Sequence, residues 1–229
     1  VPDQRGRGRS DSDPQVERYT PQTYIMDTLQ LLDALAVDTF SIVGTSMGGL
    51  MAMGISALAP ARLNRVVLND IGPVIAAQGL ERIKGSVGSK MQFPDWSTAA
   101  EHLAQVNSTA FPHYRSENWL RFAARACSQH SSEVTLDYDP NITAALSSAT
   151  SGLQPEDLWA LFDTLISTPA LLIRGALSDL LDSNCAQDMQ RRHGAMEFLE
   201  VPGVGHAPML DESGVSAAII KFLSLPVVH

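Results

Sequence analysis

The chain has 229 residues, of which 45% are hydrophobic and 18% are charged, and its formal net charge is −9. This composition is ordinary for a folded globular protein and argues against disorder. The overall acidity argues against a nucleic-acid partner, because phosphate binding requires a clustered positive field. The short basic cluster at residues 5–9 is followed at once by Asp11 and Asp13, so it predicts a solvated turn.

The cysteines and the apolar runs indicate where the protein works. Cys127 and Cys185 lie far apart in the sequence, so neither a zinc site nor a disulfide framework is predicted. No apolar run reaches about 18 residues, and the start lacks the pattern of a signal peptide. We therefore expect a cytoplasmic protein without a membrane partner or a metal. The sequence carries no signal for an oligomeric state.

The first elements predicted along the chain are a helix, a strand and a second helix. Thr20 and Pro21 form a helix start signal, and leucines at helical spacing follow them. The apolar, β-branched stretch 39–44 is typical of a buried strand. The small residues of 46–58 indicate a helix that follows directly, so the strand runs straight into this helix at Ser46.

The rest of the chain alternates between the same two patterns. Further buried strands are predicted at 64–70, 169–175 and 196–203, and further helices at 184–194 and 212–225. Strands that alternate with helices are typical of a parallel sheet with crossover helices. The fold class predicted is therefore α/β, with a mostly parallel sheet and flanking helices.

The alternation stops between two of these strands, after Gly72. The intervening stretch has helical patterns and three tryptophans but no clear strand, and a plain loop of this length is uncommon. We predict a helical cap inserted between two strands. The predicted domains are a core part at 1–71, the cap at 72–155 and a second core part at 156–229. Ordinary core packing is the simpler explanation for the aromatic residues of the cap, with Phe111, Trp119 and Phe122 as candidates for a pocket wall.

Ser46 stands at the centre of the motif that carries chemistry. Residues 44–48 match G-x-S-x-G, in which the serine occupies a strained turn between a strand and a helix. A serine hydroxyl is a poor nucleophile unless a base takes its proton and a donor stabilises the oxyanion. The positive end of the following helix points at the serine, which makes the Met47 amide the candidate oxyanion donor. The alternative is a serine that only caps its helix.

A histidine on a loop is the partner that such a serine requires. The chain offers six candidates, namely His102, His113, His130, His193, His206 and His229. The first three fall in the predicted cap, the fourth ends a helix and the last is terminal. His206 alone follows a predicted strand and precedes the final helix, between glycine and proline residues that favour a loop. His206 is therefore the predicted general base.

A carboxylate is needed to orient that histidine. Asp179 and Asp182 both follow the strand at 169–175, and Asp179 lies closer to the strand end. Asp182 is placed to cap the next helix, a role for which Ser183 competes. We predict Asp179 as the catalytic acid, with Asp70, at the end of an earlier strand, as the competing candidate.

The order Ser46, Asp179, His206, each after a buried strand, resembles the α/β-hydrolase fold family. Five segments carry the resemblance, in the order DQRGRGRSD, GTSMGG, LNDIGP, RGALSDLL and GVGHAP. It implies a serine hydrolase that needs no cofactor and cleaves a small carboxylic ester or lactone through an acyl-enzyme. The alternatives are a hydrolase of carbon–carbon bonds with the same fold and a non-catalytic protein that binds a small ligand.

One departure from the family concerns the start of the chain. Family members have further strands and an oxyanion loop before the segment that resembles DQRGRGRSD, and nothing here corresponds to them. We therefore expect an N-terminally truncated sequence, with the second oxyanion donor upstream of residue 1. The strand at 39–44 would then be an unpaired apolar edge.

Overall fold

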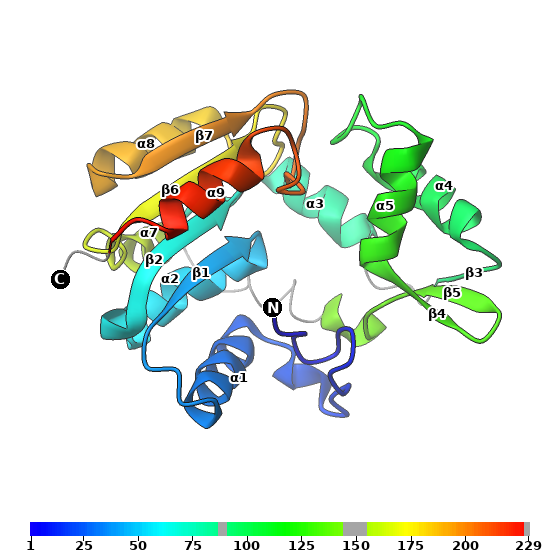
Figure 1. Ribbon diagram of the computed structural model, residues 1–229, viewed down its shortest axis with the longest axis horizontal. Helices are drawn as coiled ribbons and strands as arrows, with labels where there is room; N and C mark the ends of the chain where they lie inside the picture. Colours follow the sequence, from blue (N-terminus) through cyan, green and yellow to red (C-terminus); the bar gives the residue numbers. More distant parts are fainter. Residues whose placement is uncertain (87–90, 144–154, 227–229) are drawn as a thin grey trace. The chain divides into compact units, whose positions relative to one another are not determined.

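A computed structural model describes residues 1–86, 91–143 and 155–226 of the chain (Figure 1). The chain forms two compact units. The parallel-sheet unit comprises Pro21–Leu80 and Gly152–His229, and the antiparallel-sheet unit comprises Val1–Thr20 and Glu81–Ser151. These units differ from the predicted domains, whose boundaries lie at 72 and 155. The first 20 residues of the chain, predicted as part of the core, belong to the antiparallel-sheet unit. Residues 87–90 and 144–154 of the predicted cap, and 227–229 of the predicted second core part, lie outside the described residues.

The parallel-sheet unit contains four strands in the order β1-β2-β6-β7, and each pairs with its neighbour in parallel. Its elements are α1 (Pro21–Ala34), β1 (Phe40–Thr45), α2 (Met47–Leu58), η2 (Pro60–Arg62), β2 (Leu63–Asn69), α7 (Pro155–Asp163), β6 (Ala170–Gly175), α8 (Ser183–His193), β7 (Glu197–Val201) and α9 (Val215–Leu223). The strands lie side by side in Figure 1, with helices around them. The predicted fold class of a mostly parallel sheet flanked by helices is confirmed.

Helices cover both faces of this sheet, which explains why its central strands β2 and β6 are mostly apolar and almost entirely buried. Every residue of β6 is buried. On β2, Leu68 faces α2, where its side chain lies close to Gly49. Arg65 points to the other face, and its guanidinium lies 5.3 Å from the ring centroid of Phe222 in α9. At the edge of the sheet β1 is more open, and Val43 is 43% exposed.

The antiparallel-sheet unit contains the predicted helices of the inserted region together with strands that the sequence did not predict. Its elements are η1 (Val16–Arg18), β3 (Gln92–Phe93), α4 (Trp96–Asn107), α5 (Ser116–Ala126), β4 (Cys127–His130), β5 (Glu133–Leu136) and η3 (Pro140–Ile142), and α3 (Ala77–Ser86) spans the boundary between the units. The three strands form an antiparallel sheet in the order β3-β5-β4. The expectation of a cap without strands was wrong, because strands of two to four residues are too short to show an alternating pattern.

Aromatic side chains form the core of the antiparallel-sheet unit. The ring of Phe111 lies edge-on to those of Trp119 and Phe122, with centroids 6.0 and 5.9 Å apart. Phe111 is 2% exposed and Trp119 is 7% exposed. These contacts support the packing role that the sequence favoured for the aromatic residues of this region.

Candidate active site

The serine of the G-x-S-x-G motif occupies a strained turn between β1 and α2. Ser46 has a φ of 51° and a ψ of −118°, a backbone conformation that non-glycine residues rarely adopt. Its amide donates a hydrogen bond of 3.0 Å to the carbonyl oxygen of Asn69 on β2. The turn therefore presents Ser46 at the carboxyl end of the parallel strands, where open α/β sheets bind their ligands.

Two glycines allow this turn to form. A Cβ at Gly44 would lie 2.4 Å from the carbonyl oxygen of Gly48, and a Cβ at Gly49 would lie 2.3 Å from the side chain of Ile71. Both distances are too short for any side chain, so glycine is required where β1 meets the start of α2 and where α2 packs against Ile71. A Cβ at Gly48 meets nothing within 4 Å, so packing does not explain that glycine.

His206 reaches the serine from the loop after β7. Its Nε2 atom lies 3.0 Å from Ser46 Oγ, and its Nδ1 atom lies 3.0 Å from Asp70 Oδ2. The side chain of His206 is 7% exposed and that of Asp70 is fully buried. Because a carboxylate only accepts, the ring donates from Nδ1 and leaves Nε2 to accept the serine proton.

Asp70 immediately follows β2 and holds the ring of the histidine through a network of its own. Its φ of 57° lies in the left-handed region, which aspartate tolerates better than most residues. Oδ1 accepts from the Gly175 amide at 2.8 Å, and Oδ2 accepts from Ser178 Oγ at 2.6 Å. Both donors come from the end of β6 and the loop after it. The carboxylate is therefore hydrogen-bonded on both oxygens and fixed in orientation.

The predicted acid, Asp179, is not the carboxylate that the structure brings to His206. Its backbone carbonyl accepts from the Gly79 amide at 3.2 Å, while Asp70, the competing candidate, holds the ring. The ends of β2 and β6 are neighbours in the sheet, so the strand pattern alone does not distinguish their carboxylates. The residue before Asp179 takes part in another way, since Ser178 donates to Asp70. Asp182 caps α8 as predicted, with its side chain accepting from the Cys185 amide at 2.7 Å.

Two contributors to this network had no sequence signal. Ser178 resembles any loop serine, and the Gly175 amide is a backbone group. Ser178 accepts hydrogen bonds from the amides of Leu180 and Leu181 at 3.3 and 3.1 Å. Because those two amides occupy its lone pairs, its single proton is directed at Asp70.

Met47, the predicted oxyanion donor, is the first residue of α2. The carbonyl of Ser46 accepts from the amides of Gly49 and Leu50 at 2.8 and 3.3 Å, which closes the first turn of the helix. The Met47 amide precedes those two at the positive end of the helix. Its role as an oxyanion donor stays a prediction.

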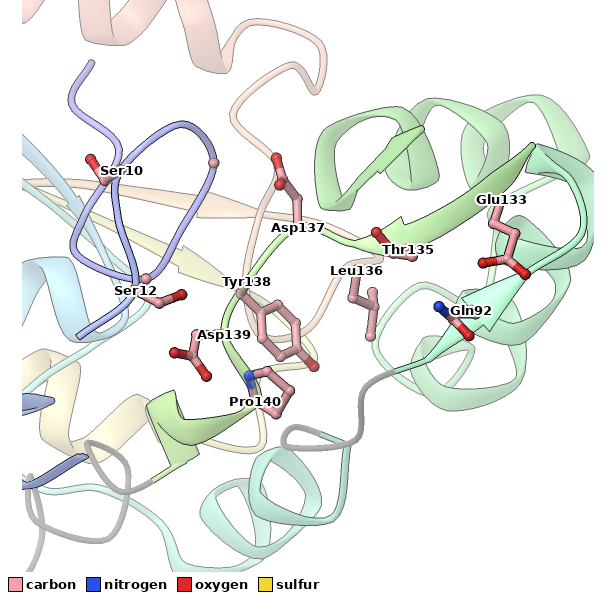
Figure 2. A pocket seen from close by; sticks show the side chains of 12 residues that line it. Ser10, Ser12, Gln92, Glu133, Thr135, Leu136, Asp137, Tyr138, Asp139 and Pro140 are labelled. Atoms are coloured by element: carbon pink, nitrogen blue, oxygen red, sulfur yellow. The ribbon is translucent and has the colours of Figure 1, made fainter. Parts of the chain in front are cut away.

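A second polar cluster lies within the antiparallel-sheet unit, beside a pocket of about 540 Å³ (Figure 2). Asp139, Asp137 and Tyr138 are among the residues that line it. The hydroxyl of Tyr19, which is fully buried, donates to Asp139 Oδ2 at 2.7 Å and accepts from the Asp13 amide at 2.8 Å. The lining of this pocket contains no histidine among the described residues, so its serines lack the histidine partner that Ser46 has.

Neither a cluster of metal-ligating side chains nor a membrane-spanning helix occurs in the described residues. Among them, no group of three His, Cys, Asp or Glu side chains is arranged to hold a metal ion. No helix in the part of the chain that the structure describes has the length and apolar character needed to span a bilayer.

Comparisons with known proteins show similarity over nearly the whole chain. The sequence model of the "Alpha/beta hydrolase family" matches residues 1–218. A 3-hydroxybutyrate-oligomer hydrolase from Cupriavidus necator is 33% identical over 97% of this chain and 78% of its own length. A 2-(acetamidomethylene)succinate hydrolase from Mesorhizobium japonicum is 27% identical over 89% of this chain and 70% of its own length.

A solved structure gives the same result. An alpha/beta hydrolase from Novosphingobium aromaticivorans superposes with a TM-score of 0.90 and 38% identity, over 97% of this chain and 78% of that one. The resemblance predicted from the five sequence segments is thus confirmed at the level of the family. The chain belongs to the alpha/beta hydrolase family.

Proposed function

We propose that the protein is a serine hydrolase that cleaves small carboxylic esters or lactones through an acyl-enzyme. The observation that carries this proposal is the continuous hydrogen-bonded chain from Ser46 Oγ through the ring of His206 to the carboxylate of Asp70. Both links measure 3.0 Å, which is within the reach needed for proton transfer. A serine at a strained turn with a base in contact is the arrangement that makes a hydroxyl nucleophilic.

The proposed reaction has two halves with one proton carrier. Ser46 Oγ attacks the carbonyl carbon of the ester while its proton passes to His206 Nε2. The tetrahedral intermediate collapses, the bond to the leaving oxygen breaks, and His206 returns the proton to that oxygen. Water then attacks the acyl-enzyme with His206 again as base, which releases the acid and restores the serine. Every proton and electron pair moves between the chain's own groups, the substrate and water, so this mechanism requires no metal or cofactor.

Asp70 replaces Asp179 as the proposed acid. The positive charge that forms on His206 during attack lies beside the buried carboxylate of Asp70, which stabilises it. The hydrogen bonds from Gly175 and Ser178 support the negative charge of Asp70 and prevent it from rotating away. The ring therefore keeps the tautomer that accepts at Nε2.

The oxyanion that forms on the substrate needs donors as well. We propose the Met47 amide as one of them, because it lies next to Ser46 at the positive end of α2. An oxyanion donor stabilises the transition state by about 2.7–4 kcal/mol. A backbone amide in this place is set by the turn itself and does not depend on the side chain of Met47.

One of the relatives favours a short ester as the substrate. The relative from Cupriavidus necator is named for hydrolysis of 3-hydroxybutyrate oligomers, in which hydroxy acids are linked by carboxylic esters. We therefore expect this protein to act on a short ester of a carboxylic or hydroxy acid.

The test is an ester panel with a matched serine control. Initial rates are measured on p-nitrophenyl acetate, p-nitrophenyl butyrate, a small lactone, the linear dimer of 3-hydroxybutyrate and a vinylogous diketone. We expect turnover of at least one ester by the natural protein and none by Ser46→Ala. Equal rates in both proteins would overturn the assignment of the nucleophile, and turnover of a vinylogous diketone in place of all esters would overturn the substrate class.

A further inference from the structure

We propose that Asn69 is a positioning residue that ties the turn of Ser46 to the loop of His206. The inference rests on the proposed function, since it concerns the geometry between the nucleophile and its base. Asn69 is the last residue of β2, is fully buried and directly precedes Asp70. It does not touch the reacting atoms, and the sequence pattern marked it only as part of a strand.

The main chain of Asn69 holds the nucleophile turn from one side. In the parallel pairing of β1 and β2, Thr45 and Asn69 are register partners. The Asn69 carbonyl accepts from the amide of Ser46 at 3.0 Å. This link depends on the backbone alone, so any residue at position 69 would keep it.

The side chain of Asn69 does what no apolar residue can do. Its Nδ2 atom donates to Thr45 Oγ1 at 3.0 Å and to the carbonyl oxygen of Pro208 at 2.9 Å. Thr45 directly precedes the nucleophile, and Pro208 follows two residues after His206. A carbonyl oxygen only accepts, so the amide nitrogen must be the group that faces Pro208. One planar amide therefore connects the two segments that carry Ser46 and His206.

The carbonyl end of the same side chain shows that stability alone does not explain asparagine here. Among the described residues, Oδ1 of Asn69 is buried and has no hydrogen-bond partner. A buried acceptor without a partner destabilises the folded state. The two hydrogen bonds that Nδ2 donates, to Thr45 and to Pro208, explain why an asparagine stands here although its carbonyl oxygen has no partner.

The two segments that Asn69 connects determine the distance between Ser46 Oγ and His206 Nε2. The two residues lie 160 positions apart in sequence and their side chains lie 3.0 Å apart in space. A displacement of about 1 Å at such a pair lowers the rate of reaction on the order of 100-fold. Loss of the Asn69 donors frees the loop of His206 from the nucleophile turn, so it should slow the chemical step without changing how the substrate binds.

The test compares three variants by activity per active site. Asn69→Leu keeps the approximate size and removes both donors, and Asn69→Asp keeps an acceptor but cannot donate to Pro208. Ser56→Ala is the matched control, because the buried Ser56 Oγ donates to the Thr164 carbonyl at 2.9 Å and lies about 15 Å along α2 from the nucleophile. Active sites are counted with a fluorophosphonate probe, and kcat and KM for p-nitrophenyl acetate are referred to that count.

We expect kcat per titrated site to fall about 10- to 100-fold in both Asn69 variants, with KM within about threefold of the natural value. Ser56→Ala should unfold at a lower temperature and keep its kcat per site. A purely structural role would instead reduce the number of titratable sites and leave each remaining site fully active.

Two outcomes overturn different claims. If the natural protein labels at Ser46 and Asn69→Leu keeps the natural kcat per site, the positioning role is wrong and the proposed function stands. If the folded natural protein neither labels at Ser46 nor hydrolyses the ester, the proposed function fails and the role of Asn69 fails with it.

Discussion

Each unit of the protein contains a carboxylate bound to a ring, and the two differ in what lies at the other end. In the parallel-sheet unit, Asp70 accepts from His206, whose second nitrogen contacts the hydroxyl of Ser46. In the antiparallel-sheet unit, Asp139 accepts from the hydroxyl of Tyr19, which accepts in turn from a backbone amide. A ring held by a carboxylate is thus a common structural device. It becomes a candidate active site only where the ring can take a proton from a nucleophile.

The largest loss of activity is expected from a substitution of Ser46. Ser46→Ala removes the nucleophile, so ester turnover should fall by at least about 10⁴-fold. Ser10→Ala is the matched control in the antiparallel-sheet unit, where Ser10 lines the pocket and its hydroxyl donates to the Asp3 carbonyl. Its turnover should stay at the natural level in the same assay of initial rates. A large loss of turnover in Ser10→Ala would instead place the active site in the antiparallel-sheet unit.

The next largest effect separates the two candidate acids. Asp70→Asn should lower kcat about 10³- to 10⁴-fold, because an asparagine amide no longer enforces the ring tautomer that accepts the serine proton. Asp179→Asn should lower kcat by less than about tenfold, since Asp70 still holds the ring. Steady-state kinetics on one ester measures both, and the opposite order would return the role of acid to Asp179.

A smaller effect is expected from the group that holds Asp70. Ser178→Ala removes one charge-assisted hydrogen bond to Oδ2 and leaves the bond from Gly175 to Oδ1. A bond of this kind is worth about 1.5–3 kcal/mol, so we expect kcat to fall about tenfold with KM little changed. Ser178→Cys, measured beside it, asks whether a weaker donor of similar shape restores part of the rate. A natural rate in Ser178→Ala would show that Asp70 needs no support from this loop.

In the antiparallel-sheet unit the corresponding substitution should change stability and not turnover. Tyr19→Phe leaves the buried amide of Asp13 without its acceptor and Asp139 without one donor. The free energy of unfolding should fall by about 1–3 kcal/mol, as measured by urea denaturation. Turnover per titrated site should match that of the natural protein, and a fall of tenfold or more would contradict a structural role.

The smallest expected effect is a pH dependence in the same unit. The Gln15 amide lowers the pKa of Asp13 below its ordinary value of 3.8, and the neighbouring Arg5 and Arg18 lower it further. A carboxylate whose pKa is lowered by folding stabilises the folded state at pH values above its ordinary pKa. This stabilisation is lost as the pH falls through the pKa of the folded state. The thermal midpoint of the natural protein should therefore fall as the pH is lowered through and below the ordinary pKa of 3.8. In Asp13→Asn the thermal midpoint, measured by circular dichroism, should fall less steeply with decreasing pH than in the natural protein. An equal pH dependence in both proteins would contradict a contribution of Asp13 to stability.

The large elements were predictable because burial leaves a strong pattern. The strands β2 and β6 are mostly apolar since helices cover both faces of the sheet, and the sequence shows that directly. The turn at Ser46 was visible because residues 44–48 match G-x-S-x-G, in which Gly44 is required by its close approach to the backbone of Gly48. Short strands such as β3 gave no pattern, so the antiparallel sheet was missed.

The candidate site was predictable only in part, for a geometric reason. Ser46 and His206 were found because each lies on a segment with a distinctive pattern, and the structure brings them together. Asp179 was predicted to contact His206, whereas Asp70 makes that contact, and the two were hard to distinguish because they follow neighbouring strands. The choice between them depends on the left-handed φ of Asp70 and on donors from the loop of Ser178, neither of which has a signature in the sequence.

The measurement that tests the central claim most directly is labelling of the protein with a fluorophosphonate probe, with the labelled residue located by peptide mass spectrometry. The chain from Ser46 to Asp70 predicts a single label on Ser46, lost in Ser46→Ala and formed far more slowly in His206→Ala and Asp70→Asn. A folded protein that labels at another serine, or that labels at Ser46 equally fast without His206, would contradict the account.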